Sequence, residues 1–211
     1  MKLISVNIGT AQPFVAKPVG KTGIFKQPVL EPVWVNRLGL EGDDICDTDS
    51  HGGADQAVYV FGAPDYEWWS AHIGRELAPG TFGENLTFSD LECAQFSIGD
   101  QLHLHQVILE VTAPRIPCVT LATRMNDAAF LKKFRAAERP GLYCRVIRGG
   151  QLQVGEAVTW ERYTGPTITA IEMFRDFYEP DLSEANLRMH LAAPIAVRAR
   201  VDKERSLREQ Q

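Results

Sequence analysis

The sequence has few cysteines, and none of them forms a Cys-x-x-Cys motif. The four cysteines, Cys46, Cys93, Cys118 and Cys144, are widely spaced in a chain of 211 residues. A disulfide framework is typical of short secreted domains with regularly spaced cysteines, so none is predicted here. Each thiol is therefore considered singly, and the default role of a free cysteine is that of a small buried hydrophobic side chain.

Long apolar runs and an excess of positive charge are also lacking. No segment approaches the roughly 20 consecutive apolar residues that a membrane-spanning helix needs. Apolar and polar residues alternate over Leu3–Ile8, as in a strand, and no signal-peptide cleavage site follows them. The formal net charge of -5 argues against nucleic-acid binding, which requires a concentrated positive surface. We therefore expect a cytoplasmic protein that binds neither membranes nor nucleic acid.

Glycine is absent after Gly165, and this marks a change in the organisation of the chain. Before it, glycines and prolines separate short apolar runs, which is typical of a β-rich fold with many turns. The expected strands lie at 3–8, 29–35, 57–61, 82–88, 101–105, 107–112, 142–147 and 157–160, with helices at 64–75 and 126–137. So many short strands favour a closed or nearly closed β-barrel, because closure removes exposed sheet edges. We predict a mainly β domain of the α+β class over residues 1–163.

The segment 164–211 has a helical pattern instead. Thr167 and Ser183 are candidate caps for two helices, and Pro194 fits the first turn of a third. A unit of this size cannot bury an independent core. We therefore expect three short helices that pack on the barrel or on another subunit, and a homodimer is one possible arrangement.

The segment Thr112-Ala113-Pro114-Arg115-Ile116-Pro117-Cys118 is the strongest candidate for chemistry. Its two prolines hold the backbone extended, so Arg115 and Cys118 project from a rigid loop. A nearby arginine favours the thiolate, which is the form of cysteine that attacks electrophiles and binds soft metals. Alternatively, Cys118 is a packed residue at a strand-to-helix corner, and the spacing alone does not decide between the two.

Three further segments carry polar residues on predicted turns. His51-Gly52-Gly53 either leaves backbone N–H groups free to face an anion or is a tight turn with a hydrogen-bonded histidine. Asn85 either binds a polar heterocycle or is an ordinary strand residue. Gly20-Lys21-Thr22 lacks the first glycine of the GxxxxGK[ST] pattern, so it predicts no nucleotide P-loop but leaves a single lysine–phosphate contact open.

Taken together and in this order, the motifs resemble the MOSC-domain family. The matching segments are Lys21-Thr22, Gly39-Leu40-Glu41-Gly42-Asp43, His51-Gly52-Gly53-Ala54-Asp55, Phe82-Gly83-Glu84-Asn85-Leu86, Gly99-Asp100 and Pro114-Arg115-Ile116-Pro117-Cys118. The resemblance covers nearly the whole chain. It is strongest to the YiiM-like branch, in which a C-terminal 3-alpha domain, similar to residues 167–205, follows the MOSC domain.

The resemblance implies a MOSC β-barrel that binds a molybdenum cofactor (Mo-molybdopterin). Cys118 matches the catalytic cysteine that supplies the protein's sulfur ligand to molybdenum. The implied cofactor-binding residues are Lys21, Thr22, His51, Gln56, Asn85 and Arg115, the first two near the pterin phosphate. Gln56 stands where relatives often have a basic residue, which weakens any charge contact to the phosphate at that position.

The implied activity is the reduction of N-hydroxylated compounds, such as 6-hydroxylaminopurine, to the amines. The sequence shows no evident acid–base pair or Ser-His-Asp set, which agrees with redox chemistry carried by a cofactor. It also has no flavin or iron–sulfur motif, so we expect a separate electron-donor protein. Two alternatives stay open: a carrier that holds a persulfide on Cys118 for metal–sulfur cofactor assembly, and a non-enzymatic binding module that interacts through its C-terminal helices.

Overall fold

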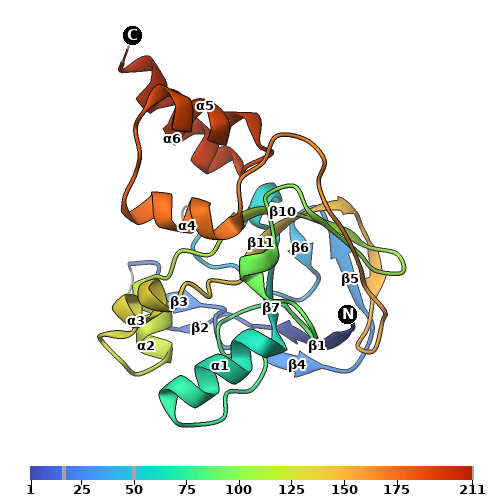
Figure 1. The fold of residues 1–211 in the computed structure, drawn as a ribbon. Coiled ribbons are helices and arrows are strands. Elements are labelled where there is room, and N and C mark those ends of the chain that lie inside the picture. The colour runs from blue at the N-terminus through green and yellow to red at the C-terminus, as the bar shows by residue number, and fades with distance from the viewer. Residues whose placement is uncertain (16–17, 49–50, 211) are drawn as a thin grey trace.

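The computed structural model describes residues 1–15, 18–48 and 51–210. Its main feature is a mixed sheet of eight strands in the order β13-β9-β10-β11-β7-β8-β1-β4 (Figure 1). The neighbouring strands are antiparallel except for β7 and β8, which run parallel. The strand bounds are β1 (Leu3–Ile8), β4 (Gln27–Val29), β7 (Val58–Gly62), β8 (Leu86–Phe88), β9 (Gln101–His103), β10 (Ile108–Pro114), β11 (Leu142–Arg148) and β13 (Thr159–Glu161).

Two smaller sheets lie beside it. One joins β12 (Gly150–Leu152), β5 (Val33–Asn36) and β6 (Gly39–Leu40), and the other pairs β2 (Gln12–Pro13) with β3 (Lys21–Thr22). The prediction of one strand over 29–35 is wrong, because the chain leaves β4 before Pro32 and enters a different sheet as β5. Proline has no N–H to donate to a ladder, so it favours such a break. The strand predicted over 82–88 is shorter than expected, since a turn occupies its first residues.

The closed barrel expected from the sequence is not seen in the pairing of the described strands, whose order has two ends, β13 and β4. An isolated bridge between Lys2 and Ala157 nevertheless joins the start of β1 to the segment before β13. The N–H of Leu3 donates to the carbonyl of Glu156 at 3.0 Å in the same place. The sheet is therefore strongly curved but open.

A cluster of aromatic side chains fixes the helices of the first 163 residues against the sheet. These helices are α1 (Ala63–Ile73), α2 (Val119–Arg124) and α3 (Phe130–Ala137), and the sequence did not predict α2. Trp69 of α1 is 0% exposed, and its ring centroid lies 5.3 Å from that of Phe130 and 5.7 Å from that of Phe134. Leu121 and Ala122 of α2 belong to the same buried cluster, which therefore also holds the helix that follows Cys118.

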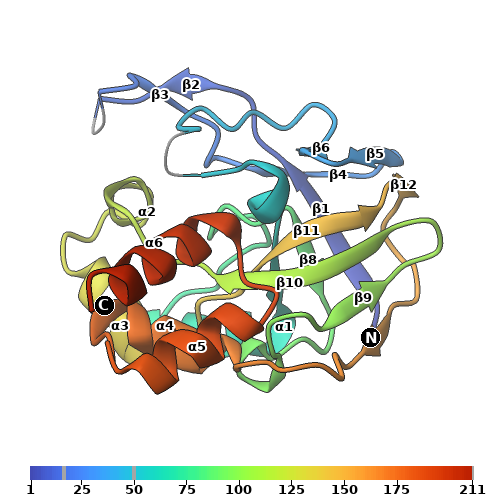
Figure 2. The same ribbon diagram turned by 90° about the horizontal axis from the view of Figure 1, so that it is seen from above.

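The remaining helices are α4 (Ala170–Tyr178), α5 (Glu184–Ala192) and α6 (Val197–Arg208). They gather on one side of the sheet, next to β10 (Figure 2). Thr169, two residues after the predicted cap, forms a capping box with Glu172 at the start of α4, and Ser183 caps α5. No helix in the described part of the chain has the length and apolar character needed to cross a membrane.

Candidate functional site

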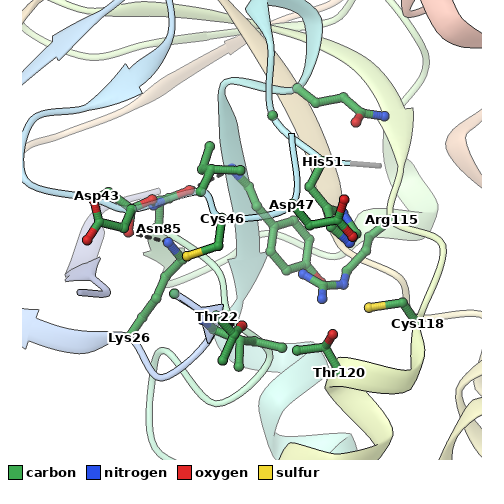
Figure 3. Close-up of a pocket in the computed structure, with 18 of the residues that line it drawn as sticks. Thr22, Lys26, Asp43, Cys46, Asp47, His51, Asn85, Arg115, Cys118 and Thr120 are labelled. Atoms are coloured by element: carbon green, nitrogen blue, oxygen red, sulfur yellow. Dashed lines mark hydrogen bonds and ion pairs between the residues drawn. The ribbon is translucent and has the colours of Figure 1, made fainter. Parts of the chain in front are cut away.

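A single pocket contains every site residue predicted from the sequence, and its volume is about 660 Å³ including the open mouth (Figure 3). Those residues are Lys21, Thr22, His51, Gln56, Asn85, Arg115 and Cys118. They come from β3, from the loop and short 3₁₀ helix η1 (Ala54–Gln56) before β7, from the turn before β8, and from the loop that joins β10 to α2. These segments converge because β10, β11, β7 and β8 are successive neighbours in the sheet.

Cys118 lies at the N-cap of α2, with extended backbone dihedrals. Its carbonyl accepts hydrogen bonds from the N–H groups of Leu121 at 2.9 Å and Ala122 at 3.2 Å. The other end of α2 is fixed by Arg124, whose guanidinium donates to the carbonyls of Thr81 at 2.6 Å and Gly80 at 2.9 Å. The thiol therefore projects from a helix start whose position is set by the turn before β8.

The environment of Cys118 favours the thiolate. Burial alone raises the pKa of the thiol, but a hydrogen bond with the His51 side chain, the charge of Arg115, and the Leu121 N–H lower it from 9.0 to about 5. Figure 3 shows the sulfur pointing toward the Arg115 guanidinium. By contrast, burial raises the pKa of Cys46, which lines the same pocket. A thiolate at this position agrees with a reactive Cys118, which is one of the two alternatives that the sequence left open.

This difference predicts the pH dependence of cysteine alkylation. We expect iodoacetamide to modify Cys118 with a rate that falls as the pH drops through about 5, because only the thiolate reacts. Peptide-resolved mass spectrometry measures the rate at each pH, and Cys46 serves as the internal control that reacts only under alkaline conditions. A midpoint for Cys118 above about pH 8 would contradict the assignment.

Arg115 is a buried pocket residue with a hydrogen-bond donor that no protein group among the described residues satisfies. Its side chain is 5% exposed, and the guanidinium carbon lies 4.8 Å from the centroid of the Tyr59 ring. Its Nε is buried and has no hydrogen-bond partner among the described residues. An unsatisfied buried donor costs about 1–3 kcal/mol, and more when it is charged. A bound molecule with an acceptor at this point would remove that cost.

The Asn85 amide makes hydrogen bonds to two protein groups, and its role as a cofactor contact stays a prediction. Its Oδ1 accepts from the Tyr59 N–H at 3.1 Å, and its Nδ2 donates to Asp43 at 2.9 Å. Lys21 is exposed and lines the pocket. Thr22 is buried, and its hydroxyl accepts from the Ile24 N–H at 3.2 Å.

Sequence reasoning missed the buried ion pair between Lys26 and Asp43 in the pocket wall. Only 7% of the lysine and 3% of the aspartate side chain are exposed. Burial lowers the pKa of Lys26, and the adjacent Asp43 partly offsets this effect. Asp43 is part of a motif that the sequence singled out, but Lys26 stands in no motif. The pairing neutralises both charges, so Lys26 contributes less to anion binding than its position in the pocket implies.

Gln56 is bound by a residue that sequence reasoning also missed. Its Oε1 accepts from Arg198 of α6 at 2.8 Å. A basic residue therefore does lie beside Gln56, and the C-terminal helices supply it.

Comparisons with known proteins agree with this architecture. The MOSC domain model matches residues 47–159. An uncharacterized protein of Bacillus subtilis, YflK, is 35% identical over 155 residues, which cover 72% of this chain and 70% of YflK. Protein YiiM of Escherichia coli is 28% identical over 142 residues, covering 65% of this chain and 63% of YiiM. A protein named "Reductase" from Gibberella moniliformis is 31% identical over 142 residues, but these cover only 25% of that protein.

Solved structures give the same result for the fold. The crystal structure of YiiM from Geobacillus stearothermophilus has a TM-score of 0.78 and 23% identity, with 98% of each chain covered. That of YiiM from Escherichia coli has a TM-score of 0.77 and 19% identity, covering 100% of this chain and 94% of the other. The resemblance found in the sequence is thus confirmed, and the chain belongs to the MOSC domain family, with YiiM and YflK among its relatives.

Proposed function

We propose that the protein is a molybdenum-cofactor-dependent oxidoreductase that reduces N-hydroxylated compounds to amines, with Cys118 as the protein's ligand to the metal. The observation that carries the proposal is the Cys118 thiolate, with a pKa of about 5, inside a pocket beside the unsatisfied Nε of Arg115. Membership of the MOSC family, which is associated with molybdenum cofactor binding, and a relative named "Reductase" support the class of reaction.

The residues present fit such a cofactor. A thiolate is a soft ligand that suits a sulfur-bound metal. The open donor of Arg115 suits a polar heterocycle or a phosphate, and its planar guanidinium can bind two oxygens at once. Lys21, which lines the pocket and is exposed to solvent, is placed to bind the phosphate group of the cofactor. Lys26 is the least suited of the pocket's cations, because Asp43 already neutralises it.

The protein's contribution to the reaction is to bind and orient. When bound, the molybdenum cofactor supplies the redox chemistry that cleaves the N–O bond. In the overall reaction, two electrons and two protons are consumed, the N–O bond breaks, an N–H bond forms, and water leaves. His51 and Arg115 keep Cys118 ionised for metal binding. The electrons come from a separate electron-donor protein.

Elemental analysis tests the proposal on protein made in a host that builds the cofactor. We expect molybdenum close to one atom per chain, and reduction of 6-hydroxylaminopurine to adenine with reduced methyl viologen as an artificial electron donor. The host must load a known molybdoenzyme in parallel. Absence of molybdenum from this protein under those conditions would refute the proposal.

A persulfide carrier is the second candidate, and the low pKa of Cys118 favours it too, because a thiolate is the form that accepts sulfur. However, Cys118 is only partly exposed within a pocket, which suits a small molecule better than the active site of a partner protein. Mass spectrometry after incubation with a cysteine desulfurase and cysteine separates the two. A persulfide on Cys118 in protein that takes up no molybdenum would favour the carrier.

A further inference from the structure

The start of α6 is bonded directly to the loop that carries His51. The Nη1 of Arg198 donates to the Gln56 Oε1 at 2.8 Å, and its Nη2 donates to the carbonyls of Thr48 at 2.8 Å and His51 at 3.4 Å. One guanidinium thus binds the loop before, at and after His51. A planar arginine fork can hold several oxygens in a fixed geometry, which a lysine cannot.

A second set of bonds fixes α6 itself relative to the sheet. The Val197 N–H donates to an oxygen of Asp55 at 2.8 Å, and the other Asp55 oxygen lies 3.2 Å from the Nε of Arg145 on β11. Arg145 also donates to the carbonyls of Pro194 at 3.1 Å and Ile195 at 3.3 Å, just before the helix. These bonds fix the start of α6, so Arg198 has a defined position from which it binds the loop.

The loop that carries His51 has few conformational restraints of its own. Gly52 and Gly53 both have positive φ angles, 70° and 80°, and neither belongs to a helix or strand. Glycine in this conformation leaves the backbone with little intrinsic preference for one path. His51, Gly52 and Gln56 nevertheless line the same pocket as Cys118, so the path of this loop sets the shape of the pocket wall.

We infer that Arg198 is a positioning residue of the pocket: from the C-terminal helix α6 it holds the His51 loop in the wall of the pocket that contains Cys118, so that α6 forms part of the site. The importance of this role rests on the proposed function. The positioning itself can be measured in cofactor-free protein, so the two can fail separately. If the protein binds no molybdenum but shows the behaviour below, the proposed function fails and this inference stands.

The test compares Arg198→Gln with a matched variant of the same helix, Arg200→Gln. Arg200 donates to the carbonyls of Leu191 at 2.9 Å and Ala193 at 2.8 Å, so it ties α6 to α5 and not to the pocket. The readout is peptide-resolved amide hydrogen exchange over residues 45–48 and 51–57, divided by the exchange of the β1 amides in the same sample, so that a general loss of stability cancels. We expect this exchange ratio to rise at least about fivefold in Arg198→Gln, to rise less in Arg198→Lys, and to stay unchanged in Arg200→Gln.

The iodoacetamide rate on Cys118 at a single alkaline pH, about 9.5, gives an independent readout of access to the pocket. We expect this rate to rise in Arg198→Gln and to keep the wild-type value in Arg200→Gln. Because loss of Arg198 could also destabilise the protein, Gln56→Ala serves as a second variant that removes one arm of the contact and leaves α6 intact. We expect it to change the exchange ratio in the same direction. An unchanged exchange ratio in the folded Arg198 and Gln56 variants, or an equal rise in Arg200→Gln, would overturn the inference.

Discussion

Replacing Cys118 with alanine is expected to remove the bound molybdenum and to lower the rate of 6-hydroxylaminopurine reduction on the order of 100-fold or more. Loss of a residue that merely supports a metal ligand commonly costs about 10–100-fold in metal affinity or activity, so loss of the ligand itself should reach at least the upper end. The pocket places Cys118 beside Arg115 and gives it a pKa of about 5, so it is the thiol suited to this role. Elemental analysis and the viologen-coupled assay measure both quantities on the same sample.

Cys46→Ala is the matched control for this experiment. Cys46 lines the same pocket and its replacement removes the same atoms, but burial raises the pKa of its thiol. We therefore expect the Cys46 variant to keep its molybdenum and its activity. Full metal content in Cys118→Ala, or equal losses in both variants, would show that Cys118 is not the ligand.

Replacing Trp69 with alanine is expected to lower the free energy of unfolding by about 3–5 kcal/mol, as for other large aromatic-to-alanine changes in cores. The ring is fully buried between Phe82, Phe130 and Phe134, so its loss leaves a cavity that several rigid rings cannot fill. Since domains are commonly stable by only about 5–15 kcal/mol, this is a large share of the total. Urea denaturation followed by circular dichroism measures the change.

Two variants make the result specific to burial. Trp34 on β5 is 47% exposed, and we expect Trp34→Ala to cost less than about 1 kcal/mol. The Nε1 of Trp69 has no hydrogen-bond partner in the described part of the chain, so Trp69→Phe loses no hydrogen bond and should cost less than Trp69→Ala. A Trp69→Ala variant no less stable than Trp34→Ala would rule out the aromatic cluster as a main source of stability.

Features that depend only on the pattern of consecutive residues could be predicted from the sequence. The alternation over Leu3–Ile8 predicted β1 at its observed bounds, and the apolar run from Ala57 predicted the buried β7 to within a residue. Five of the six motifs also contribute residues to the pocket, and each motif could be recognised because its residues are neighbours in the chain. Their convergence in space follows from the order of the strands, which no single motif encodes.

Features that depend on distant partners could not be predicted. Whether a row of short strands closes into a barrel depends on whether β4 and β13 pair, and the number of strands does not decide this. The Lys26–Asp43 pair is buried, although lysine and aspartate are usually exposed. The contact between Arg198 and Gln56 joins residues 142 positions apart, and nothing in the helical pattern of α6 marks that arginine among its neighbours.

The bond between α6 and the His51 loop also sets an order of events during synthesis. Chains fold from the N-terminus as they emerge from the ribosome. The His51 loop and every strand of the main sheet are synthesised before α6. The sheet can therefore form while the pocket still lacks the hydrogen bond between Arg198 and Gln56. The pocket reaches its finished geometry only after α6 has emerged and docked. Under the proposed function, insertion of the cofactor is therefore expected to be a late step, acting on a chain whose sheet is already folded.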